Sequence, residues 1–189
     1  MSDTHALSIE EYRALRATIR DRGTARSIVT VITFVAWSAV AVAIHAAFTI
    51  PTLALMPLIV LAAGFEVIFA THIGVERIGR FLYVHYEVGG KDTPCWEHAI
   101  GDIGARAGAG SGIDPLCSVL FIIATLANLV PAILAAATLP NASGVFSSLG
   151  FFAAVHAIFI VRVLGARRFA ASQRPRDTQL FQDAARAER

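Results

Sequence analysis

Long apolar stretches alternate with charged stretches along this chain, and that alternation predicts helices that cross a membrane. A helix needs about 20 mostly apolar residues to cross a hydrocarbon core of about 30 Å. Four segments approach that length: about 28–48, 53–75, 116–139 and 145–164. Short uncharged turns join the first segment to the second and the third to the fourth, which predicts antiparallel neighbours. The expected fold class is therefore an all-α integral membrane protein, a four-transmembrane-helix bundle.

The distribution of basic residues predicts the orientation of this bundle. All 16 lysine and arginine residues belong to the N-terminal segment 1–27, the middle loop 76–115 with the end of the preceding span, or the C-terminal end 162–189. Four spans place these three regions on one side of the membrane. By the positive-inside rule, both termini and the middle loop are cytoplasmic (N-in, C-in), and the predicted location is the inner, cytoplasmic membrane of a cell.

Composition agrees with a membrane domain that carries a cytoplasmic collar. The chain divides into a cytoplasmic arm (1–27), a four-helix membrane domain (28–165) and a basic cytoplasmic tail (166–189). Its residues are 56% hydrophobic, and its mean hydropathy is +0.62. A net charge of +2 is too small to indicate a nucleic-acid partner. The arginines are instead interpreted as anchors to the anionic inner leaflet of the lipid bilayer.

The arm begins with the signals of a helix. Ser8 and Glu11 have the spacing of a capping box, apolar residues recur at helical spacing, and Gly23 is the expected C-terminal stop. An amphipathic helix with an arginine-rich polar face, directly before a span, is expected to lie along the membrane interface. The alternative is a helix that packs on the protein's own cytoplasmic loop.

The second span is expected to continue as a helix beyond the membrane. No helix breaker other than Gly79 occurs between residues 75 and 87, and Glu76 and Arg80 form a favourable i,i+4 pair.

Ionisable and polar residues inside the spans are the candidate functional residues, because such groups are costly in hydrocarbon. A rise of 1.5 Å per residue places four of them at similar depth, one from each span: Glu66, His156, Asn128 and Ser38. We expect these residues to form an intramembrane polar layer with a Glu66–His156 pair. A polar clasp that fixes helix register is the favoured role. A proton or cation relay, or a Glu66 that faces a partner subunit, remain alternatives.

A second group of charged residues lies near the inner membrane boundary: His72, Glu76, Arg77, Arg80 and Arg162. His72 is rotated away from Glu66 by about 240°, so it does not belong to the polar layer. Glu76 and Arg162 are expected to form an interfacial ion pair, which is favoured over a catalytic role.

No cofactor, metal or catalytic site is expected. Haem held between two helices needs histidines at matching depth, which His45, His72 and His156 do not provide. Cys95 and His98 have a Cys-x2-His spacing, but one half-site without a second pair favours a plain surface loop over zinc. Nucleophile, nucleotide and metalloprotease motifs do not occur.

These patterns favour a non-enzymatic accessory or scaffold subunit of a membrane complex, with a protein partner in the membrane or a homo-oligomeric state. The alternative is a small oligomeric transporter or channel, coupled to protons or cations through Glu66 and His156. A membrane enzyme that uses His72 and Glu76 is the least favoured hypothesis. Small residues recur every four positions, for example Ala39 and Ala43 or Ala153 and Ala157. They permit close helix packing, either within the protein or against a partner.

Overall fold

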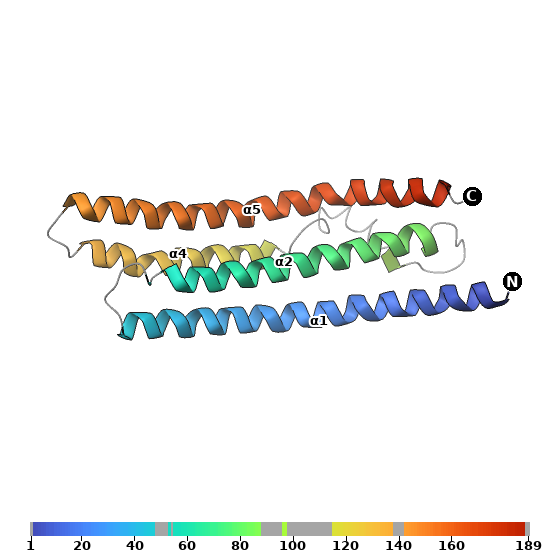
Figure 1. Ribbon diagram of the computed structural model, residues 1–189, viewed down its shortest axis with the longest axis horizontal. Helices are drawn as coiled ribbons and strands as arrows, with labels where there is room; N and C mark the ends of the chain where they lie inside the picture. Colours follow the sequence, from blue (N-terminus) through green and yellow to red (C-terminus); the bar gives the residue numbers. More distant parts are fainter. Residues whose placement is uncertain are drawn as a thin grey trace. The chain divides into compact units, whose positions relative to one another are not determined.

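The computed structural model is helical throughout the elements that it describes, which cover residues 2–47, 53, 55–87, 96–97, 115–137 and 142–187. No strand occurs in these ranges. The elements, in chain order, are α1 (Ser2–Ala47), α2 (Met56–Leu82), the π-helix η2 (Tyr83–Glu87), α4 (Pro115–Ala137) and α5 (Ala142–Ala187) (Figure 1).

Three helical stretches are long and apolar enough to cross a membrane: Ile9–Ala46, Met56–Glu87 and Leu149–Ala187. A shorter apolar helix, Pro115–Pro131, lies within α4. The expectation of an all-helical protein is thus confirmed for the described residues, with three helices long and apolar enough to span a membrane.

Two helices run further than their sequence signals suggested. α1 continues through Gly23, so the expected stop at this residue is wrong. Glycine ends a helix only where the chain turns away, and inside a helix it costs about 1 kcal/mol relative to alanine. In a helix of 46 residues, this cost is too small to end the helix at Gly23. Similarly, the C-terminal tail is helical as part of α5, even though Pro175 lies within it.

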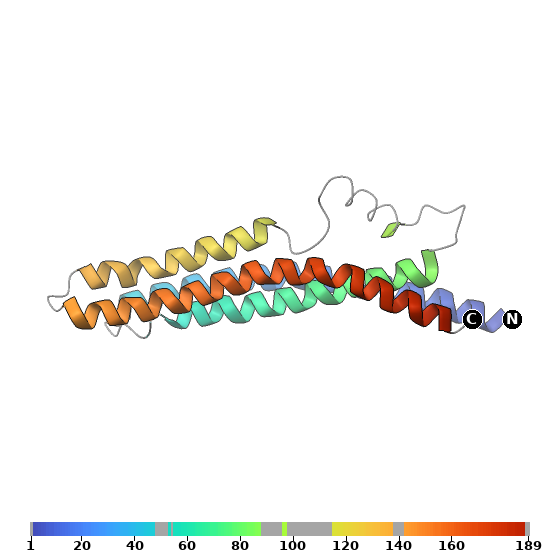
Figure 2. The same ribbon diagram turned by 90° about the horizontal axis from the view of Figure 1, so that it is seen from above.

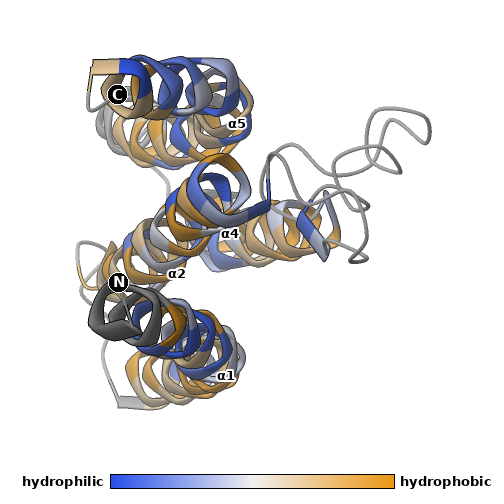
Figure 3. Cartoon of the chain, turned by 90° about the vertical axis from the view of Figure 1, so that its right-hand side faces the viewer, coloured by the Kyte–Doolittle hydropathy of each residue, from blue (hydrophilic) through white to orange (hydrophobic). Residues whose placement is uncertain are grey.

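The chain folds as two compact units. The first unit comprises Met1–Arg26, Phe69–Gly112 and Arg167–Arg189, and the second comprises Ser27–Ile68 and Ile113–Ala166. α1 and α5 therefore each contribute residues to both units, and each carries hydrophobic and hydrophilic residues (Figure 3).

An aromatic cluster forms the core of the second unit. The Phe121 ring lies 5.1 Å from that of Phe34 and 5.3 Å from that of Phe65, and Phe65 also contacts Phe159 at 5.9 Å. The start of α5 runs beside α4 in both side views (Figures 1 and 2). Gly64 lies directly against the Thr33 side chain, where a Cβ would overlap it. Glycine is therefore needed for this close approach of α1 and α2.

The outer surface of the second unit is apolar as well. Val31, Val42, Ile59 and Ile158 expose more than half of their surface, at 64%, 68%, 59% and 69%. Such a surface suits lipid as its solvent, because apolar side chains are exposed there without cost.

Candidate functional site

Two of the four residues expected in the polar layer meet in the interior of the second unit. Asn128 Nδ2 lies 3.1 Å from His156 Nε2, and both residues are buried. His156 Nδ1 lies 2.7 Å from the carbonyl oxygen of Phe152 on its own helix. In the neutral tautomer with the proton on Nδ1, the ring donates to Phe152 and accepts from Asn128. Both ring nitrogens then have partners, as a polar clasp requires.

Glu66 does not pair with His156, contrary to the expectation. Its carboxylate instead accepts a hydrogen bond of 2.7 Å from Arg162 Nη2, and both side chains are substantially exposed, at 50% for Glu66 and 39% for Arg162. The reason is rotational phase. Arg162 follows His156 by six residues, which turns it by roughly 240° around α5, away from the buried face. Glu66 and His156 lie at similar depth along their helices, but this did not bring them into contact.

Ser38 also lies outside the polar pair. Its side chain is exposed, and its hydroxyl donates to the carbonyl of Val35 on the same helix at 2.9 Å. This local bond satisfies the hydroxyl without any neighbouring helix.

In the first unit, Asp177 of α5 holds two arginines of α2. Its Oδ2 accepts from Arg80 Nη2 at 2.9 Å and from Arg77 Nε at 3.3 Å. The Arg80 and Asp177 side chains are only 8% and 6% exposed. Arg80 also donates to Glu76 at 3.3 Å, so the favourable i,i+4 pair is present. We call Glu76, Arg77, Arg80 and Asp177 the Asp177 network.

Glu76 and Arg162 were expected to pair with each other, but each has a different partner. Glu76 contacts Arg80, and Arg162 contacts Glu66. Asp177 was not singled out from the sequence at all. A signal for it existed, because Ala166, Ala170, Asp177 and Phe181 recur at helical spacing. Phe181 packs on Phe81 at 5.6 Å, which places the same face of α5 towards α2.

A second set of contacts joins the N-terminal segment to η2 and Glu97. Arg16 donates to Glu87 at 2.9 Å and to Glu97 at 2.6 Å, and the Tyr86 hydroxyl donates to Glu11 at 2.6 Å. The rings of Tyr12 and Tyr86 lie 5.5 Å apart. These contacts favour the alternative in which the N-terminal helix packs on the protein itself.

His72 lies beside a cation. Arg26 Nη1 is 3.2 Å from His72 Nδ1. Because a guanidinium only donates, Nδ1 acts as the acceptor and the ring proton is on Nε2. Nε2 is buried and has no hydrogen-bond partner among the residues that the structure describes.

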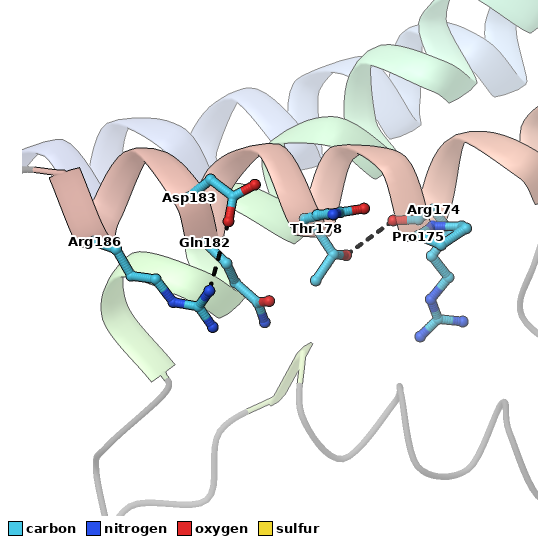
Figure 4. A pocket seen from close by; sticks show the side chains of 7 residues that line it. Arg174, Pro175, Thr178, Gln182, Asp183 and Arg186 are labelled. Carbon is cyan, nitrogen blue, oxygen red and sulfur yellow. Dashed lines mark hydrogen bonds and ion pairs between the residues drawn. The ribbon is translucent and has the colours of Figure 1, made fainter.

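A hollow of about 690 Å³ lies along the last turns of α5, and its described lining comes from that helix alone: Arg174, Pro175, Thr178, Gln179, Gln182, Asp183 and Arg186. Arginines stand at both ends of this row (Figure 4). Arg186 pairs with Asp183 at 3.6 Å, and Thr178 donates to the Arg174 carbonyl at 2.9 Å.

Within the described ranges, no three His, Cys, Asp or Glu side chains gather closely enough to hold a metal ion. Cys95 and His98, the half-site considered from the sequence, lie outside the described residues.

Comparison with known proteins gives no assignment: no protein-family model, curated protein or solved structure matches this chain.

Proposed function

We propose that this chain is a multi-pass protein of the inner membrane, with four spans and both termini in the cytoplasm, and that it acts as a non-enzymatic accessory or scaffold subunit of a membrane complex. The distribution of charge supports this orientation. Arg162 is the only lysine or arginine in the sequence ranges of the second unit, and all the other basic residues belong to the first unit. This is the distribution that the positive-inside rule associates with cytoplasmic termini and a cytoplasmic middle loop.

The Asp177 network carries the proposal of a subunit role. It joins α2 to a part of α5 that is 97 residues distant in sequence, through a pair that is almost fully buried. The contacts of Arg16 and Glu11 add the N-terminal segment to the same unit. Three distant segments thus form one folded, charged body, which is what a protein needs in order to present a defined surface to a partner.

Exposed apolar side chains on this charged body support a partner contact as part of this proposal. Trp96 is 63% exposed and Leu180 is 66% exposed, and both belong to the first unit. Aromatic residues are enriched in protein interfaces, where they often contribute most of the binding energy. We therefore place the partner contact at Trp96 and Leu180.

Native mass spectrometry of gently solubilised membranes tests this role. The wild-type chain is expected to retain a second protein at defined stoichiometry, and the variant Trp96→Ala/Leu180→Ala is expected to lose it. Gln179→Ala, an exposed neighbour on α5, is the matched control and should retain the partner. A chain that carries no second protein, or a partner that the double variant retains, contradicts the proposal.

A small transporter or channel is the second candidate, and the buried Asn128–His156 pair is the observation that favours it. In this function, Glu66 and His156 serve a proton or cation pathway in an oligomer. Glu66→Gln and His156→Gln should each abolish proton flux in vesicles while leaving assembly intact. Flux that is unchanged in both variants removes this candidate.

A further inference from the structure

The described helices of the second unit carry one carboxylate and one guanidinium, and the two are paired on its surface. The Glu66 carboxylate and the Arg162 guanidinium are 2.7 Å apart, with exposed fractions of 50% and 39%. The surface around them is apolar: Val67 is 51% exposed and Ile158 is 69% exposed. A half-exposed ion pair on such a surface is unlike the rest of the unit and requires an explanation.

Depth makes the pair costly in lipid. Glu66 precedes Glu76 by ten residues on an unbroken helix, so the two are separated by roughly 15 Å along its axis. If Glu76 lies at the inner boundary, Glu66 lies well inside the hydrocarbon. Hydrocarbon supplies neither hydrogen bonds nor solvation to the exposed half of an ion pair. Protein coverage of this surface removes that cost.

The residues beside the pair allow another helix to approach closely. Ala63 and Ala154 are exposed, and Gly165 has no atom within 4 Å of the position of a Cβ. Ala63 lies one turn before Glu66 on α2, and Gly165 lies one turn after Arg162 on α5. Small side chains at such positions let helix backbones approach each other in membranes, where packing drives association.

We propose that this surface, formed by Ala63, Glu66, Arg162 and Gly165, binds a second copy of this chain in a twofold-symmetric dimer within the membrane. The inference rests on the proposed membrane placement and not on the subunit role.

Charge complementarity identifies the occupant. In a twofold interface the same patch faces itself, so a patch with one anion beside one cation complements its own copy. Rotation by 180° about an axis between the two side chains brings Glu66 of one copy towards Arg162 of the other. Four charges then neutralise one another. A different protein would have to supply a matching anion and cation of its own, which a second copy already has.

Disulfide cross-linking of the full chain in native membranes tests the dimer. In a Cys95→Ser/Cys117→Ala background, co-expressed Ala63→Cys and Ile158→Cys chains are expected to form a covalent dimer under mild oxidation, because the rotation places α2 of one copy opposite α5 of the other. Val42→Cys, equally apolar and 68% exposed on α1, is the matched control and should remain monomeric. Equal cross-linking at both positions, or none at Ala63→Cys, overturns the proposal. So does a cross-link from Ala63→Cys to a different protein, although this result leaves the subunit role intact.

Larger side chains at the same surface provide a second test of the dimer. Ala63→Trp and Gly165→Trp should weaken dimerisation in lipid nanodiscs at least tenfold, because the added side chains prevent close approach. Neither should lower the melting temperature, since both positions are open, and Val42→Trp should leave the dimer unchanged. A dimer that tolerates Ala63→Trp overturns the proposal. Carbonate extraction tests the membrane placement on which both proposals depend. A chain released from membranes by carbonate contradicts both this dimer and the proposed function.

Discussion

In the first unit three charged side chains, Arg80, Glu87 and Asp177, are among the buried residues, whereas the buried interior of the second unit is dominated by Phe65, Phe121, Leu61 and Ile68. On the outside the pattern reverses. The second unit exposes valine and isoleucine, and the first unit exposes arginines such as Arg13 and Arg20.

This difference separates two ways of making a helical contact specific. Aromatic rings in the second unit specify a contact by shape, and close approach at Gly64 and Thr33 adds to this. Ion pairs in the first unit specify contacts by charge, because a buried charge needs its particular partner. Loss of one partner should therefore be more damaging in the first unit than loss of a polar contact in the second.

Asp177→Ala should produce the largest effect. It removes the closer of the two carboxylates that pair with the buried Arg80 and leaves only Glu76, at 3.3 Å. Breaking a buried ion pair from one side costs about 3–5 kcal/mol, and the remaining pair with Glu76 keeps the loss towards the lower end of that range. Limited proteolysis in detergent should show cleavage within the first unit while the second unit remains protected. Asp183→Ala, whose carboxylate is 58% exposed, is the control and should change stability by less than about 0.5 kcal/mol. Equal proteolysis of the two variants would show that charge does not hold this unit together.

Gly64→Ala tests whether shape holds the second unit together. The added Cβ overlaps the Thr33 side chain, and overpacking typically costs about 1–3 kcal/mol. Thermal unfolding should show the loss, and Thr33→Ala in the same chain should restore part of it, because the Thr33 Cγ2 and Oγ1 atoms are removed while its Cβ remains 2.7 Å from the added Cβ. Gly150→Ala is the control, because no atom lies within 4 Å of its Cβ position. If Thr33→Ala restores no stability, the loss caused by Gly64→Ala does not arise from contact with Thr33.

His156→Leu and Asn128→Leu test the polar exception inside the second unit. Each single variant removes the hydrogen bond between Asn128 and His156 and keeps one of the two polar groups, and the double variant removes both groups. A double-mutant cycle should give a coupling of about 0.6–1.7 kcal/mol, the range found for hydrogen bonds between membrane helices. A coupling near zero would mean that the pair does not fix the contact between α4 and α5.

Tyr86→Phe should have the smallest effect. It removes one exposed hydrogen bond to Glu11 and keeps the ring that contacts Tyr12, so a loss of about 0.5 kcal/mol is expected. Thermal unfolding measures it, with Tyr86→Ala as the comparison that also removes the ring. A larger loss for Tyr86→Phe than for Tyr86→Ala would contradict the assignment of the main contact to the ring.

The sequence predicted the helices better than it predicted which residues of different helices are in contact. Hydropathy alone indicated apolar helices, and the extension of the second helix to Glu87 followed from the absence of breakers. Depth along the helices brought Asn128 near His156, and these two residues are hydrogen bonded. The partner of Glu66 was assigned wrongly, because depth fixes one coordinate and the rotation of each helix fixes the other. Asp177 escaped notice because a charged tail gives no hydropathy signal, and its position on α5 matters only once that helix is known to continue past Pro175.

The Asp177 network also sets an order of events during synthesis. Arg80 and Asp177 are separated by 97 residues, and translation at about 5–20 residues per second leaves an interval on the order of 5–20 s between them. Throughout this interval a nascent chain carries Arg80 with Glu76 but without Asp177, its closer partner. The first unit can therefore close only after Asp177 has been synthesised, which is later than the apolar segments that precede it in the sequence. A chain truncated before Asp177 would expose an incomplete first unit to cellular proteases, whatever the state of its apolar helices.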